Sequence, residues 1–112
     1  MRFKEKCIRM KTAFKMKLLP GFQEEYKKRH DEIWPEVSGL LKESGVSDYS
    51  IFLDEETNTL FAVQQQVSGA SSQDLGQHPI IQRWWAYMAD IMETNSDNSP
   101  VSGSLKMVFH LD

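Results

Sequence analysis

Two polar aromatic side chains, Tyr26 and His30, stand four residues apart in the stretch from residue 21 to 41. If this stretch is helical, they share an inward stripe whose members recur every three or four positions: Phe22, Tyr26, His30, Ile33, Val37 and Leu40. A phenol and an imidazole on an inward face need hydrogen-bond partners, because a buried polar group without one costs free energy. An imidazole titrates near neutral pH, so His30 can give and recover a proton. A lone histidine is more often a satisfied core residue, and the pair favours a site without deciding it.

A tryptophan pair, Trp84 and Trp85, is the second group that can do chemistry. Adjacent residues on a helix point about 100° apart, so only one of the two rings can be central in the core. Core packing accounts for either ring alone, whereas an aromatic ring at a site can stack on the apolar face of a sugar. Tyr49 can add a hydroxyl. Together with Tyr26 and His30, these side chains suit a neutral polyhydroxy ligand and include no spacing typical of a metal site.

The elements that must hold these residues alternate between strands and helices. Apolar residues at every second position predict strands, and apolar residues at every third or fourth position predict helices. The expected order is a strand from 10 to 18, a helical stretch from 21 to 41, a hairpin of strands near 49–53 and 60–67, a helix from 79 to 92, and a strand from 105 to 111. This is an α+β, ferredoxin-like βαββαβ order, an antiparallel sheet with both helices on one face.

Proline and glycine mark the ends of these elements. Pro35 predicts a kink or break after His30, and Asp31 is available to cap the helical segment that follows. Gly45 suits the left-handed residue that ends a helix, and Pro79 suits a first helical turn. His30 is therefore expected near a helix end.

Composition limits the class of protein. The chain has 112 residues and one cysteine, which fits a single domain without an internal disulfide. We expect residues 1–9 to be a flexible basic extension and residues 10–112 to be one domain. The rest of the chain is acidic, so we expect no nucleic-acid partner. No apolar run approaches the length of a membrane span and no signal peptide is visible, so we expect no membrane partner and a cytoplasmic location.

Several stretches resemble the L-rhamnose mutarotase family. They are EEYKKRHDEIWPEV, YSIFLD, QRWWAYMADIM and DNSPVSGSL, and the RHxxIWPE and QRWW strings are the specific ones. The resemblance covers nearly the whole chain from Met10, and the stretch from Gly76 to Pro79 departs from it. It implies a homodimer of ferredoxin-like fold that interconverts the anomers of L-rhamnose without a cofactor. It also implies roles for five residues, with His30 as proton donor and with sugar contacts from Tyr26, Tyr49, Trp84 and Trp85.

Two other classes of protein also fit these residues. A ferredoxin-like dimer of this size also suits a cofactor-independent monooxygenase or a haem-handling enzyme, with His30 as base or axial ligand. A non-catalytic sugar-binding module is the other class. For mutarotation, the base that takes the anomeric proton is open between Glu36 and Asp54, both of them more often surface carboxylates.

The face of the sheet that no helix covers predicts a homodimer. Outward residues such as Phe52 and Val108 are too apolar to stay in water at no cost. We expect two sheets to pack face to face in a dimeric α/β barrel-type assembly, with the last strand reaching across to pair with the neighbour.

Overall fold

The computed structural model describes residues 9–67 and 75–112, which form four strands, three α-helices and one 3₁₀ turn. Their order is β1 (Arg9–Lys17), α1 (Gln23–Asp31), α2 (Pro35–Glu43), β2 (Val46–Asp54), β3 (Thr59–Val67), α3 (Pro79–Met88), η2 (Ala89–Ile91) and β4 (Ser102–Leu105). Residues 1–8, most of the expected basic extension, lie outside the described residues. No helix in the described ranges is long and apolar enough to cross a membrane.

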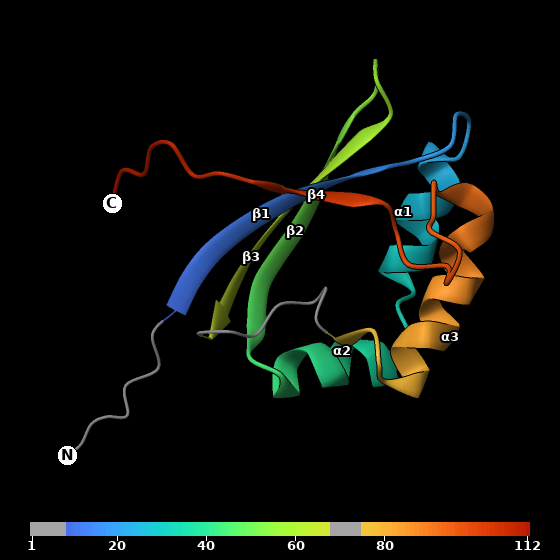
Figure 1. The fold of residues 1–112 in the computed structure, drawn as a ribbon, viewed down its shortest axis with the longest axis horizontal. Helices are drawn as coiled ribbons and strands as arrows, with labels where there is room; N and C mark the ends of the chain where they lie inside the picture. Colours follow the sequence, from blue (N-terminus) through green and yellow to red (C-terminus); the bar gives the residue numbers. More distant parts are fainter. Residues whose placement is uncertain (1–8, 68–74) are drawn as a thin grey trace.

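The strands form one antiparallel sheet in the order β2-β3-β1-β4. Each neighbouring pair is antiparallel, and the central pair, β1 with β3, runs in register from Arg9 opposite Val67 to Lys17 opposite Thr59. Figure 1 shows the helices together on one side of the sheet. The α+β, ferredoxin-like arrangement is therefore confirmed.

The core lies between the sheet and the helices. Phe14 and Met16 of β1 stand opposite Ala62 and Leu60 of β3, and all four side chains are buried. Paired residues of an antiparallel ladder point to the same face, so these four form the floor on which the helices pack. On the helical side, the same buried cluster includes Tyr26 of α1, Val37 of α2, and Ile81, Trp84, Met88 and Ile91 of α3 and η2.

The expected helical stretch breaks where Pro35 predicts. The first segment ends at Asp31, and the second begins with Pro35 as its first helical residue. Gly45 has a φ of +92°, which confirms the left-handed residue after α2. The expected cap by Asp31 is wrong: the α2 N-cap residue is Trp34, whose side chain makes no capping bond. The Asp31 carboxylate is instead 2.8 Å from the Lys27 ammonium one turn earlier.

Two other expectations are also corrected. Phe22 is exposed, because it stands at the N-cap of α1 rather than within the helix. The helix expected to reach Met92 stops at Met88 and continues as the 3₁₀ turn η2.

The expected last strand, from 105 to 111, is wrong in its position. β4 comprises only Ser102–Leu105, which pairs with Ala13 to Met16 of β1, and residues 106–112 form no regular element. These last residues are exposed, and Figure 1 shows the C-terminal end running away from the helices. Residues 106–112 are all exposed, so in the described part of the chain their alternating apolar side chains gain no burial that would favour a strand.

Candidate active site

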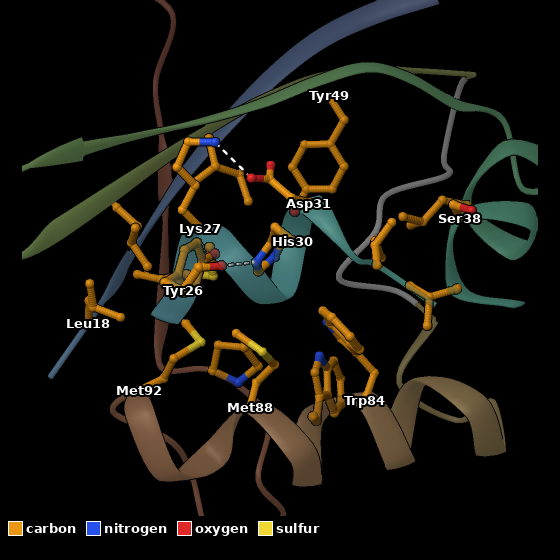
Figure 2. A pocket seen from close by; sticks show the side chains of 18 of the residues that line it. Leu18, Tyr26, Lys27, His30, Asp31, Ser38, Tyr49, Trp84, Met88 and Met92 are labelled. Carbon is orange, nitrogen blue, oxygen red and sulfur yellow. Dashed lines mark hydrogen bonds and ion pairs between the residues drawn. The ribbon is translucent and has the colours of Figure 1, made fainter. Parts of the chain in front are cut away.

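A cavity of about 1060 Å³ lies between the helices and β2. It is lined by all five residues that the sequence singled out: Tyr26 and His30 from α1, Tyr49 from β2, and Trp84 and Trp85 from α3. Figure 2 shows Tyr26, His30, Tyr49 and Trp84 around this space. The rest of the wall is largely apolar and includes Met16, Leu18, Ile51, Leu53, Leu60, Met88 and Met92.

His30 lies in the last turn of α1 and is tied to its own helix. Its Nδ1 is 3.1 Å from the backbone carbonyl oxygen of Tyr26. A carbonyl oxygen can only accept a hydrogen bond, so the geometry places a hydrogen on Nδ1. Nε2 is then the ring atom that gains or loses a proton.

Two aromatic rings fix the orientation of the His30 imidazole. The Tyr26 ring stacks on it with centroids 4.2 Å apart, and the Trp84 ring meets it edge to face at 5.6 Å. Burial among these rings lowers the pKa of His30 below its usual value, and the Tyr26 carbonyl and the nearby Asp31 charge offset part of that shift. The imidazole is therefore mainly neutral at neutral pH, and its protonated form is a stronger acid than an ordinary imidazolium.

The two tyrosines differ in burial. Tyr26 is buried in the core, and burial, with a smaller contribution from the Tyr49 phenol, raises the pKa of Tyr26 well above its ordinary value. Its hydroxyl therefore keeps its proton and can donate a hydrogen bond to a ligand, but it is no base. Tyr49 is half-buried and packs against Phe14, with ring centroids 6.4 Å apart.

The tryptophan pair divides as the helix geometry predicts. Trp84 is central, with only 8% of its surface exposed, and Trp85 is half-buried. Trp85 packs on Gly76, where an added Cβ would come within 2.5 Å of the ring. Gly76 therefore leaves room for Trp85 at the start of α3, in the stretch where the sequence departs from the family pattern.

Two residues that the sequence analysis did not single out, Trp34 and Arg29, pack next to residues of the cavity wall. The Trp34 ring meets Trp84 edge to face at 5.1 Å and stacks on Tyr87 at 5.4 Å. Arg29, next to His30, contacts both α3 and η2. Both residues belong to the RHxxIWPE string, so their position beside His30 and Pro35 was the available signal.

The two carboxylates considered as bases do not line the cavity. Glu36 is exposed on α2, and the Asp54 carboxylate accepts hydrogen bonds from the Glu56 amide and the Thr57 hydroxyl in the hairpin turn. The carboxylates that do line the cavity are Glu24, Asp31, Asp48 and Glu55.

The other histidines lie away from the cavity. His78 is exposed and caps α3, its Nδ1 accepting from the Ile80 amide at 3.2 Å. His110 is exposed and 3.0 Å from the Asp112 carboxylate. Within residues 9–67 and 75–112, no group of three His, Cys, Asp or Glu side chains is placed to hold a metal ion.

Known proteins resemble this chain over almost its whole length. The family model for L-rhamnose mutarotase matches residues 11–111. An L-rhamnose mutarotase of Flavobacterium johnsoniae is 59% identical over 92% of this chain and 96% of its own length. One from Bacteroides thetaiotaomicron is 60% identical over 91% of this chain and 98% of its own. The crystal structure of the L-rhamnose mutarotase from Formosa agariphila matches with a TM-score of 0.84 and 56% identity, over 92% of this chain and 99% of that one. The chain therefore belongs to the L-rhamnose mutarotase family.

Proposed function

We propose that this protein interconverts the α and β anomers of L-rhamnose, with His30 as the proton donor. The observation that carries the proposal is the His30 imidazole in the cavity wall, with Nδ1 engaged by its own helix and Nε2 left to exchange a proton. Membership of the family supports L-rhamnose as the substrate, because the relatives are named L-rhamnose mutarotase.

Mutarotation needs only proton transfers. A proton is delivered to the ring oxygen while another leaves the anomeric hydroxyl, and the bond between C1 and the ring oxygen breaks. The product is an open aldehyde with a hydroxyl at C5. Rotation about the C1–C2 bond and attack by that hydroxyl on the other aldehyde face give the second anomer. One acid and one base suffice, and such catalysis typically contributes about 10² to 10⁴-fold.

The cavity residues divide these tasks. Protonated His30 gives its Nε2 proton to the ring oxygen and recovers it on reclosure, when the neutral imidazole accepts from the C5 hydroxyl. Trp84 and Trp85 supply aromatic surface for the C–H face of the sugar, and the Tyr26 and Tyr49 hydroxyls bond to its polar groups. The reaction requires no cofactor. A carboxylate of the cavity wall is the proposed source of the base.

Saturation-transfer NMR of anomer exchange tests the function directly. The protein is mixed with L-rhamnose and with a panel of other pyranoses, and exchange between the two anomeric proton signals is measured against buffer alone. We expect exchange of L-rhamnose to be faster with the protein than with buffer. An L-rhamnose exchange rate equal to that in buffer, from protein shown to be folded, would reject the proposal.

We also propose that the protein is a homodimer formed through the sheet face. Phe52 of β2 is 63% exposed, and beyond β4 the side chains of Val108 and Phe109 are 88% and 77% exposed. Burying such side chains is favourable by roughly 1.5–3 kcal/mol each. A second copy has the same apolar surface to offer, and a twofold arrangement covers both at once.

Sedimentation of the native chain and two charged variants tests the dimer. We expect a dimer at micromolar concentration, and we expect Phe52→Asp and Val108→Asp to weaken it, because each would bury an unpaired carboxylate. Lys28→Asp, an exposed change on α1, serves as the matched control and should leave the mass unchanged. A native monomer, or dimers that survive both Phe52→Asp and Val108→Asp, would show that the interface is wrong.

A further inference from the structure

The helix that carries His30 has little apolar anchorage of its own. α1 has nine residues, and Tyr26 is the one buried among them. The N-cap residue, Phe22, makes no side-chain capping bond. Short helices of polar composition are marginal by themselves and depend on tertiary contacts to stay in place. The position of His30 therefore depends on whatever holds α1 to the rest of the molecule.

Arg29 makes that attachment. Its Nε donates to the Glu25 carboxylate at 2.7 Å within α1, and its Nη1 donates across to the Tyr87 carbonyl at 2.8 Å and the Asp90 carboxylate at 2.9 Å. Nη2 reaches the second Asp90 oxygen at 3.3 Å, and the guanidinium carbon lies 4.4 Å from the centre of the Tyr87 ring. Although it is charged, only 11% of its side chain is exposed.

These contacts join the same elements that meet at the site. Arg29 precedes His30 on α1, and its partners Tyr87 and Asp90 follow Trp84 along α3 and η2. The Tyr87 ring also touches Trp84, at 5.7 Å between centroids. The edge-to-face contact of His30 with Trp84 thus lies beside the Arg29 contacts, which set the separation of α1 from α3 and η2.

We propose that Arg29 is a positioning residue that holds the His30 imidazole at the distance from Trp84 at which Nε2 meets the ring oxygen of a bound sugar. This inference rests on the proposed function for its catalytic consequence and on the Arg29 contacts for its structural part. Lysine can replace arginine here only in part, because a single ammonium cannot reach a carbonyl and both carboxylate oxygens in the planar geometry that a guanidinium offers.

The test compares Arg29→Gln, Arg29→Lys and Asp90→Asn with the native enzyme. Small displacements of a catalytic group lower the rate of the chemical step, and about 1 Å of misplacement can cost roughly a hundredfold. We expect Arg29→Gln to lower kcat at least about tenfold while KM changes less than about threefold, since the tryptophans that contact the sugar stay on α3. Arg29→Lys and Asp90→Asn should fall between it and the native enzyme.

A second readout does not depend on activity. The His30 ring protons are titrated by NMR, and we expect the pKa of His30 in Arg29→Gln to move from its lowered value toward the ordinary 6.5, because a looser α1 lets water reach the ring. Lys28→Gln, which removes a positive charge from the exposed side of the same helix, is the matched control and should change neither kcat nor the pKa.

The outcomes separate the two proposals. A native enzyme that does not accelerate anomer exchange rejects the proposed function, whereas the His30 titration still tests the positioning role. A native enzyme that is active, with Arg29→Gln retaining kcat within about twofold per folded molecule and an unmoved His30 pKa, would show that Arg29 only stabilises the fold.

Discussion

His30→Ala is expected to abolish the enhanced anomer exchange of L-rhamnose, with a fall of about 10² to 10⁴-fold, the usual size of a general acid–base contribution. The physical reason is that no other imidazole lines the cavity within the described residues, and the buried Tyr26 hydroxyl is far too weak an acid. The rate is measured by saturation-transfer NMR at equal concentrations of folded protein. His30→Gln, which can still donate to the Tyr26 carbonyl, should lose as much activity.

His78→Asn is the matched control for the loss of an imidazole. Asparagine is a good helix cap, so α3 keeps its N-terminal hydrogen bond, and the rate should stay near the native one. More than about a tenth of the native rate in His30→Ala would remove His30 from the proton-donor role. Added imidazole should restore part of the lost rate.

The pH dependence of the same rate checks the protonation state. The donor is the imidazolium form, whose fraction falls as pH rises through the pKa of His30 in the folded protein. Because burial lowers that pKa below the ordinary value, the His30-dependent rate should already be declining between pH 6 and 8, after subtraction of buffer catalysis. A rate that rises with pH over this range would instead assign His30 the role of base.

Trp84→Ala should cause the largest loss of stability, about 3–5 kcal/mol in the free energy of unfolding. The ring is buried and contacts His30, Trp34 and Tyr87, so its removal leaves a cavity among rings that cannot easily close together. Urea unfolding at one fixed protein concentration measures the loss. A change smaller than about 1 kcal/mol would contradict the central place given to this ring.

Two variants complete the comparison with Trp84→Ala. Phe22→Ala removes an aromatic ring that is exposed at the start of α1, and the free energy of unfolding should change by no more than about 0.5 kcal/mol. Trp84→Phe keeps part of the aromatic surface and should remain folded, with a raised KM for L-rhamnose because the stacking surface is smaller. An unchanged KM would indicate that Trp84 supports the site without touching the sugar.

Several elements of this fold could be predicted from the sequence because their limits depend on the backbone conformation of single residues. Pro35 marks the break between α1 and α2, because a proline ring clashes with the preceding turn of a continuous helix. Gly45 follows α2 with a positive φ, a conformation that costs glycine little. The inward spacing of Tyr26 and His30 likewise places both in the cavity. All five residues to which the family resemblance assigns a role lie in the wall of the cavity.

The parts that were missed depend on contacts between distant segments. The contacts of Arg29 with Asp90 and the Tyr87 carbonyl join residues about sixty positions apart, and no local pattern around Arg29 indicates them. The packing of Trp34 against Trp84 likewise joins two segments that are far apart in the sequence. The last strand was predicted at the wrong position because its alternating pattern is present, whereas residues 106–112 are exposed in the described structure and gain no burial from a strand.

The exposed C-terminal segment also bears on how the protein behaves when it is heated or concentrated. Residues 105–111, LKMVFHL, combine high strand propensity with a single full positive charge and no proline or glycine, which is the composition of segments that initiate intermolecular sheets. Leu105 ends β4, which is an edge strand of the sheet formed by the described residues, and residues 106–111 follow directly. While this segment is exposed, Lys106 is the residue that most opposes its aggregation, because a charge within such a run repels the same charge in a stacked copy. We therefore expect the exposed residues 105–111 to promote association between copies when the protein is heated or concentrated.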